Sequence, residues 1–170
     1  MPYFKIKMIQ INKKGKVILA GAGPGDPDLI SLKALKYLQT ADVILTDRLV
    51  SPILIEQYAR KEAEVIYVGK QCSKGIWTPQ SDINNLMVEF ALQDKLVLRL
   101  KGGDASLFSN VLDELHAVKN NNIPYEIIPG ISAAFGAAAY TGIPLTARGF
   151  SRGVRFLTLY DLDKVGSHQW

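Results

Sequence analysis

Short apolar runs alternate with longer amphipathic segments along most of this 170-residue chain, and this alternation constrains the fold more than any other feature. Buried strands are predicted by the apolar runs at residues 17–20, 41–46, 65–68, 96–100 and 125–128. Helices are predicted by apolar residues at helical spacing within residues 29–38, 51–58, 83–91, 111–118 and 132–141. Strands that are apolar on both faces and separated by helices pair in parallel, with helices packed over both faces. The sequence therefore predicts an α/β fold with a mostly parallel five-stranded sheet.

Two segments lie outside this alternation. Residues 1–14 form a basic head with no strand or helix pattern. Residues 148–153 are polar and contain glycine, which is typical of a linker, and residues 154–160 predict one more strand for which no partner follows. We therefore expect an N-terminal α/β domain over residues 15–146. Residues 147–170 would be a linker and the first strand of an incomplete second domain, with exposed apolar side chains at Phe156, Leu157 and Leu159.

The charge of the chain is unevenly placed. The formal net charge is +4, but residues 1–16 contain five lysines and no acidic residue, which leaves 15 basic and 16 acidic residues in the rest. A near-neutral body without a basic stripe argues against nucleic-acid binding. No apolar run approaches the ~18 residues of a membrane span, and a single Cys72 fits a reducing cytoplasm. His116 and His168 lie apart from each other and from any cysteine, so no metal site is predicted.

The loops that follow the strands form the candidate site, because ligands of such sheets bind outside the carboxyl ends of the strands. Glycines within residues 21–25 and 102–103 let a ligand approach the backbone closely. Asp104 can bind an ammonium group, and the helix N-terminus near Ser132 can bind a carboxylate. Together these loops predict a ligand that carries the two charged groups of an amino acid.

Two charged residues follow the second and third strands. Asp47 can act as a base or hold a cation, and Lys70 can bind a carboxylate or move a proton. Ordinary alternatives exist for each loop. Asp47 can pair with Arg48 at the surface, Lys70 can simply be solvated, and the first glycine loop can be a tight turn in which Asp26 or Asp28 caps the next helix.

Taken together and in order, these loops resemble the tetrapyrrole methylase superfamily, and within it the uroporphyrinogen-III C-methyltransferase group, over about residues 15–159. The motifs that carry the resemblance are Gly-Ala-Gly-Pro-Gly-Asp-Pro at 21–27, the segment 41–50 with Asp-Arg-Leu-Val at 47–50, Val-Gly-Lys at 68–70, Gln80 with Ile83 and Asn84, Arg-Leu-Lys-Gly-Gly-Asp at 99–104, Pro-Gly-Ile at 129–131 and Gly-Ile-Pro-Leu-Thr-Ala-Arg at 142–148. The combination favours this group over related methylases that act on ribosomal RNA or diphthine.

The resemblance implies transfer of methyl groups from S-adenosylmethionine to C2 and C7 of uroporphyrinogen III, which gives precorrin-2 for sirohaem or cobalamin synthesis. It also implies a cytoplasmic homodimer of two-domain subunits with the cofactor between the domains. Asp47 and Lys70 match the proton-transfer pair of the family. The residues that match its cofactor contacts are Pro24, Gly102, Gly103, Asp104, Leu107, Ser132 and Ala133.

Three stretches depart from the family pattern. After the Gly-Gly-Asp triplet the family has Pro-Phe-Ile-Phe-Gly-Arg-Gly-Gly-Glu, whereas residues 105–113 read Ala-Ser-Leu-Phe-Ser-Asn-Val-Leu-Asp. The usual Gly-x-His after the Gly-Lys pair is replaced at residues 73–77, and Ala147 stands where the family has histidine. We therefore expect a substrate-facing loop of different shape and charge.

Three hypotheses of function follow. The first is a uroporphyrinogen-III methyltransferase whose chain lacks most of its second domain, so that these 170 residues bind the cofactor weakly and turn over little or nothing. The second is a non-catalytic N-terminal domain or remnant. The third is a nicotinamide-dependent oxidoreductase, which fits less well because Asp26 stands where a dinucleotide fingerprint has its third glycine.

Overall fold

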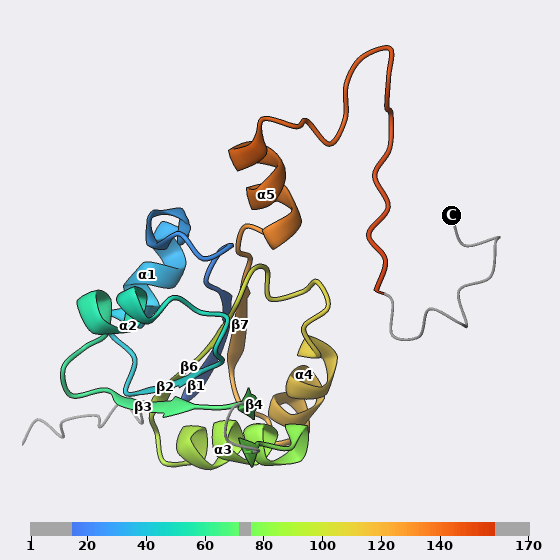
Figure 1. Cartoon of the computed structure of the whole chain (residues 1–170). Coiled ribbons are helices and arrows are strands. Elements are labelled where there is room, and N and C mark those ends of the chain that lie inside the picture. Colours follow the sequence, from blue (N-terminus) through green and yellow to red (C-terminus); the bar gives the residue numbers. More distant parts are fainter. Residues whose placement is uncertain (1–14, 72–75, 159–170) are drawn as a thin grey trace, which may run out of the picture.

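The computed structural model describes residues 15–71 and 76–158 and contains the predicted five-stranded sheet, all of whose strand pairs are parallel (Figure 1). Its strands, in the order β3-β2-β6-β1-β7 across the sheet, are β3 (Glu64–Tyr67), β2 (Val43–Thr46), β6 (Leu96–Lys101), β1 (Lys16–Gly21) and β7 (Tyr125–Ile128). Each strand coincides with one of the apolar runs of the sequence. The prediction of an α/β fold with a mostly parallel sheet is therefore confirmed.

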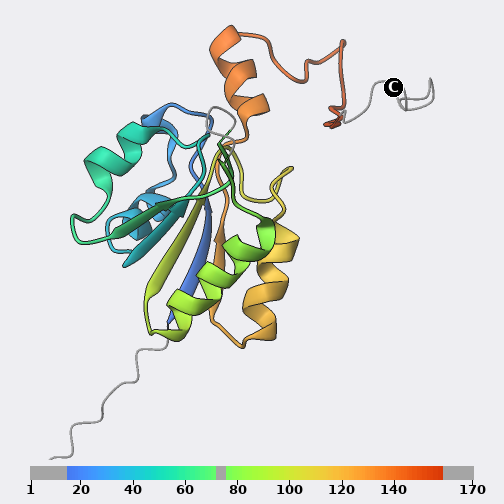
Figure 2. The ribbon, with the colours of Figure 1, turned by 60° about the horizontal axis from the view of Figure 1, so that its bottom comes forward.

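Helices cover both faces of this sheet, also as predicted (Figures 1 and 2). One face is covered by α1 (Leu32–Leu38) and α2 (Pro52–Tyr58), and the other by α3 (Gln80–Leu92) and α4 (Val111–Asn120). Helix α1 begins at Leu32, later than the sequence pattern suggested, because the chain first forms a 3-10 turn, η1 (Pro27–Leu29). The hydroxyl of Ser31 then accepts a hydrogen bond from the amide of Ala34 at 3.2 Å and caps the helix.

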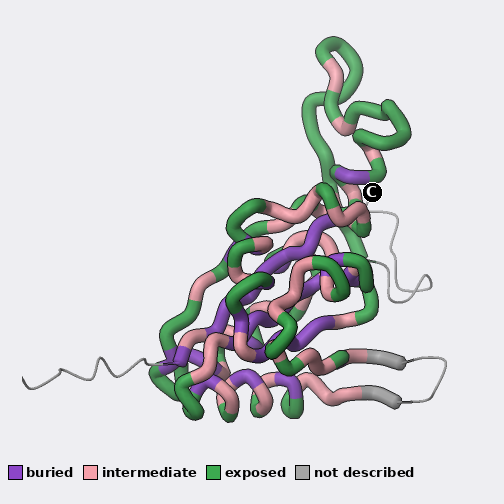
Figure 3. Tube along the Cα trace, turned by 90° about the vertical axis from the view of Figure 1, so that its left-hand side faces the viewer, coloured by how far each residue is buried: buried purple, intermediate pink, exposed green. Residues whose placement is uncertain are grey.

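The core consists of two apolar clusters, one on each side of the sheet (Figure 3). Successive strand residues point to opposite faces, so Ile18 packs toward α1 and α2 while its neighbours Val17 and Leu19 pack toward α3 and α4. All three are fully buried. Burial of one such side chain stabilises the fold by about 1.5–3 kcal/mol. The run Val-Ile-Leu-Ala at residues 17–20 of β1 is therefore wholly apolar because both faces of this strand lie in the core.

Two local predictions need correction or addition. A short antiparallel hairpin, β4 (Lys70–Gln71) with β5 (Ile76–Trp77), was not predicted. Residues 154–160 were expected to form a strand, but residues 154–158 contain none, because no strand among the described residues lies beside them to accept their backbone hydrogen bonds. Leu157 is exposed as expected, Phe156 is half-buried against Phe135 at 5.7 Å between ring centroids, and Leu159 lies outside the described residues.

The last helix, α5 (Ala133–Thr141), stands beyond the carboxyl ends of the strands and does not return over the sheet (Figures 1 and 2). Within the sheet, β1 and β6 are neighbours whose following helices, α1 and α4, lie on opposite faces. Such a reversal opens a crevice at the carboxyl ends of the two strands, where α/β proteins bind ligands. None of the helices within residues 15–71 and 76–158 has the length and apolar character that a membrane span requires.

Candidate functional site

Four glycines bring the loops after β1, β6 and β7 into direct backbone contact. A Cβ atom on Gly21 would lie 2.7 Å from the amide nitrogen of Gly130, and one on Gly130 would lie 2.8 Å from Cα of Gly21. The amide of Gly23 donates to the carbonyl of Gly103 at 3.1 Å, and the amide of Gly103 donates back to Gly23 at 2.8 Å. No residue with a side chain fits at this crossing, so the glycines set the spacing of the three loops.

Asp104 ties the β6 loop to the β7 loop. Its Oδ2 accepts a hydrogen bond from the amide of Gly130 at 2.9 Å, and its Oδ1 accepts from the amide of Ser106 at 2.8 Å and from the Ser106 hydroxyl. Partial burial raises the pKa of Asp104, but these hydrogen bonds, with one from the amide of Ala105, outweigh it and hold the pKa below its ordinary value. Asp104 therefore stays ionised, and part of its hydrogen-bonding capacity is used within the protein.

Helix α5 packs against the first glycine loop. A Cβ on Gly136 would lie 2.6 Å from Cβ of Pro24, so the helix approaches the proline through a residue without a side chain. The hydroxyl of Tyr140 also donates a hydrogen bond to Asp26 in that loop. At the start of α5, Ser132 is the N-cap residue, and a Cβ on Gly103 would lie only 3.6 Å from the amide nitrogen of the next residue, Ala133.

Most of the residues that the sequence predicted for cofactor binding lie close together as a result of these contacts. Six of them lie on the three loops that meet at the glycine crossing: Pro24, Gly102, Gly103, Asp104, Ser132 and Ala133. The seventh, Leu107, lines a cavity on the other side of Gly102. The first amides of α5 have no acceptor within the helix, so they are available to an anionic group.

The cavity beside these loops has a volume of about 520 Å³ and is lined by residues of β6, of the loops after β2, β3 and β6, and of the start of α3. Asp47 and Leu49 form one wall, and Leu107 and residues 108–110 form the opposite wall. The carboxylate of Asp47 accepts a hydrogen bond from the amide of Leu49 at 3.1 Å and keeps about a fifth of its side chain exposed. Asp47 is therefore able to accept a proton from a molecule in the cavity.

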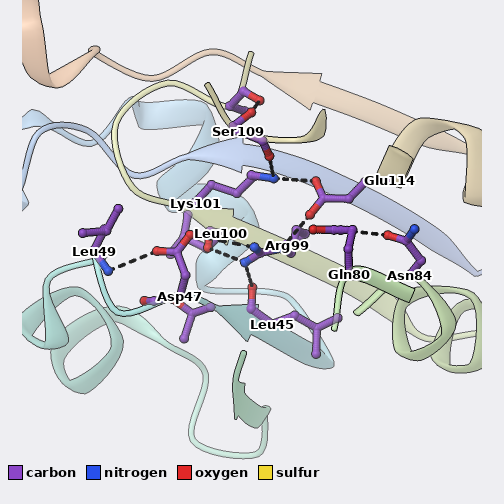
Figure 4. A network of polar contacts seen from close by, with 12 residues as sticks. Leu45, Asp47, Leu49, Gln80, Asn84, Arg99, Leu100, Lys101, Ser109 and Glu114 are labelled. Carbon is purple, nitrogen blue, oxygen red and sulfur yellow. Dashed lines mark hydrogen bonds and ion pairs between the residues drawn. The ribbon is translucent and has the colours of Figure 1, made fainter. Parts of the chain in front are cut away.

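A buried ion network lies under this cavity, and sequence reasoning did not identify it (Figure 4). Glu114 in α4 is fully buried and pairs with Arg99 and Lys101 of β6, at 3.0 Å and 2.7 Å. Arg99 lies 3.8 Å from Asp47 at its other end. Two features of the sequence could have predicted these ion pairs. A strand buried on both faces must pair any cation it carries, and Glu114 occurs among the apolar residues of the α4 pattern.

Lys101 connects the network to the wall formed by residues 105–110. Its ammonium donates to the carbonyl of Ser109, between Phe108 and Asn110, which both have left-handed backbone with φ of 53° and 52°. Burial lowers the pKa of Lys101, and the nearby charge of Glu114 partly opposes this. Non-glycine residues in the left-handed region are strained, so the contact from Lys101 helps to hold this loop in place.

Lys70, the second residue predicted to move protons, begins β4. Its side chain is outside the part of the structure that is described. The residue before it, Gly69, has φ of 98°, and a Cβ there would lie 3.9 Å from Cβ of Asp47. The backbone thus brings the Gly-Lys pair next to Asp47. Within residues 15–71 and 76–158, no group of three or more His, Cys, Asp or Glu side chains could hold a metal ion.

Comparison with known proteins shows what the chain is similar to. It matches the family described as Tetrapyrrole (Corrin/Porphyrin) Methylases over residues 16–168. A siroheme synthase from Pseudomonas entomophila is 47% identical over 160 residues, and one from Saccharophagus degradans is 49% identical over 160 residues. Each alignment covers 94% of this chain and 34% of the relative. The chain thus spans about a third of the length of the curated relatives that it matches.

Solved structures of the same fold are also similar. A uroporphyrin-III-C-methyltransferase from Thermus thermophilus superposes with a TM-score of 0.71 at 39% identity, over 82% of this chain and 58% of that one. A Thermus thermophilus structure of this enzyme complexed with S-adenyl homocysteine has a TM-score of 0.66 at 36% identity, over 82% and 53%. A cobalt precorrin-4 methyltransferase, CbiF, has a TM-score of 0.71 at 32% identity, over 82% and 56%.

Proposed function

The chain belongs to the tetrapyrrole methylase family, and from this premise we propose that it takes part in methyl transfer from S-adenosylmethionine to C2 and C7 of uroporphyrinogen III. The product would be precorrin-2, a precursor of sirohaem and cobalamin. The proposal is supported by the siroheme synthases at 46–49% identity and by the uroporphyrin-III-C-methyltransferase structure at 39% identity.

The observation that carries this proposal is the junction of the three glycine loops beside a cavity with an ionisable carboxylate. The loops of Gly23, Gly103 and Gly130 present backbone groups, the N-terminus of α5 and the carboxylate of Asp104 around one point. The cavity of about 520 Å³, which Gly102 also lines, has the size of a site for an organic molecule. A cofactor site and a substrate site therefore adjoin each other.

The residues at the junction fit S-adenosylmethionine. Its carboxylate matches the free amides at the start of α5, near Ser132 and Ala133. Its ammonium group matches Asp104, whose lowered pKa keeps it anionic. When bound, the cofactor supplies an electrophilic methyl group on a sulfonium ion.

The proposed roles of the protein groups concern protons and position. A pyrrole carbon that gains a methyl group makes its ring cationic, and the ring returns to neutrality when a proton leaves. Asp47, at the wall of the cavity, accepts that proton, and Lys70 is its partner in proton transfer. Gly102 has no room for a side chain, because a Cβ there would overlap Leu49, so the loop after β6 packs directly against the loop that carries Asp47.

Two measurements on the 170-residue chain test this proposal. Calorimetric titration with S-adenosylhomocysteine should release heat, whereas titration with NAD should not, and selective binding of NAD would refute the assignment. Incubation with uroporphyrinogen III and methyl-labelled cofactor should transfer label slowly. Asp47→Asn should strongly reduce the transfer and leave a measurable residual rate, while the exposed Asp82→Asn should leave it unchanged. Equal transfer by both variants would exclude Asp47 as the base.

We also propose the domain and assembly features that the family resemblance implies. Residues 15–146 would form the methylase domain, residues 147–170 would lead into further structure, and the working protein would be a cytoplasmic homodimer. The apolar side chains of Phe135, Ile143 and Phe150 are exposed near α5, which supports a surface that another domain or subunit covers in the working protein. Sedimentation equilibrium tests the dimer, because a monomer at every accessible concentration would contradict it.

A further inference from the structure

Glu114 is a fully buried carboxylate that the proposed chemistry does not use. It lies in α4, the helix that follows the altered loop 105–110, and none of its side chain is exposed. Burial of a charge is costly unless partners compensate for it. Glu114 has two such partners, since Oε1 accepts from Nε of Arg99 at 3.0 Å and Oε2 accepts from Nζ of Lys101 at 2.7 Å.

The contact through Oε1 leads to the wall that carries Asp47. Arg99 lies in β6, and its Nη1 donates to the carbonyls of Leu45 at 3.3 Å and Leu100 at 3.2 Å. Its Nη2 is 3.8 Å from Oδ2 of Asp47. A guanidinium group is planar and rigid, so an anchor at Nε determines where Nη2 points. Glu114, together with the carbonyls of Leu45 and Leu100, therefore sets the position of the cation that faces Asp47.

The contact through Oε2 leads to the opposite wall. Nζ of Lys101 is shared between Glu114 and the carbonyl of Ser109, in the loop with two left-handed residues. Each oxygen of one carboxylate is thus connected to a different wall of the cavity (Figure 4). Stability alone does not require such an arrangement, because well-packed apolar residues often stabilise a core as well as buried ions do.

We propose that Glu114 is a positioning residue that fixes the two walls of the substrate cavity relative to each other, acting on Asp47 through Arg99 and on loop 105–110 through Lys101. The role of Asp47 in this statement rests on the proposed function. The mechanical part, that Glu114 holds both walls, stands on the contacts alone.

The first experiment tests the mechanical part without any catalysis. Amide proton–nitrogen NMR spectra are compared between the parent chain and Glu114→Gln, which keeps the size of the side chain and removes its charge. The matched control is Glu126→Gln, because Glu126 also holds two cations, Lys16 and Lys33, but lies on β7 among residues that do not line the cavity.

In Glu114→Gln, we expect shifts in the amide of Leu49, which donates to Asp47, and in the amides of residues 105–110. The control should shift amides of α1 and β7 and leave those of Leu49 and the loop in place. Shifts in Glu114→Gln that stay within α4 and β6 would overturn the proposal. If this variant does not fold, the double variant Lys101→Met with Glu114→Gln replaces it, because it removes one cation together with one anion. The Leu49 amide should still shift in the double variant. An unchanged Leu49 amide would overturn the proposal.

The second experiment tests the effect on methyl transfer. A misplaced base lowers the rate of the chemical step more than it affects binding, so Glu114→Gln should reduce kcat by about tenfold to hundredfold, with KM for S-adenosylmethionine unchanged. In an Asp47→Asn background it should cause little further loss, because both changes act on one group. Equal losses in the two backgrounds would contradict action through Asp47. If the parent chain neither transfers methyl groups nor binds S-adenosylhomocysteine, the proposed function is wrong, and the NMR result alone decides the inference.

Discussion

A methyl group added at Gly130 tests how tightly the three glycine loops must pack. In Gly130→Ala, the new Cβ would lie 2.8 Å from Cα of Gly21 and closer still to the carbonyl oxygen of Gly103. Both neighbours are backbone atoms that cannot rotate away. Ordinary contact between carbon atoms requires about 3.5 Å, so the loops have to separate.

The cost follows from that separation. Overpacking of a well-packed region costs about 1–3 kcal/mol. The loops are joined by the Gly23–Gly103 hydrogen bonds of 3.1 and 2.8 Å and by the bond from Gly130 to Asp104, and each net hydrogen bond contributes about 1 kcal/mol. We expect the free energy of unfolding to fall by about 2–4 kcal/mol. Affinity for S-adenosylhomocysteine should fall as well, because the loops that would hold it move apart.

Urea denaturation followed by circular dichroism measures the first effect, and calorimetry measures the second. Gly153→Ala is the matched control, since a Cβ at Gly153 has no heavy atom within 4 Å and its backbone is not left-handed. The control should change the stability by less than about 0.5 kcal/mol. If Gly130→Ala were as stable as the control and bound the ligand equally well, the close packing inferred for the three loops would be wrong.

Three further predictions concern single side chains. Asp104→Ala removes the acceptor for the amide of Gly130 and the proposed partner of the cofactor ammonium, so affinity for S-adenosylhomocysteine should fall by about tenfold or more in calorimetry; unchanged affinity would rule out that role. Lys70→Ala should lower the rate of methyl transfer more than cofactor affinity, and the reverse pattern would exclude it from proton transfer. Hydrogen bonds, of which that from Lys16 is the largest, lower the pKa of Glu126 from 4.5 to about 2. Because the folded-state pKa is the lower one, this stabilisation is present above about pH 4.5 and is lost as the pH falls toward 2, so the urea midpoints of the parent and Glu126→Gln should converge over that range.

The strands were predictable because their physical signal is local. A strand covered by helices on both faces is apolar at nearly every position, and the runs around Ile18 and Ile44 meet that condition. The wrong prediction, a strand at residues 154–160, shows the limit of this signal. An apolar run indicates that a segment can be a strand, but only a neighbouring strand that accepts its hydrogen bonds makes it one.

The candidate site was predictable in part. The glycine loops were recognised because glycine permits close backbone approach, and the strand ends of a parallel sheet share one edge. Glu114 was missed because an acidic residue on a helix is usually solvated. Its burial depends on Arg99 and Lys101, which the chain places 15 and 13 residues earlier.

The sequence by itself determined the α/β class, the number of strands in the main sheet and the loops that border the site, because each depends on the spacing of apolar and glycine residues along a short stretch of chain. Only the tertiary structure decided the strand order β3-β2-β6-β1-β7, the crossing of the three glycine loops and the pairing of Glu114 with both walls of the cavity. These features depend on which distant segments become neighbours. That choice is made by packing both faces of the sheet at once, and no local pattern contains it.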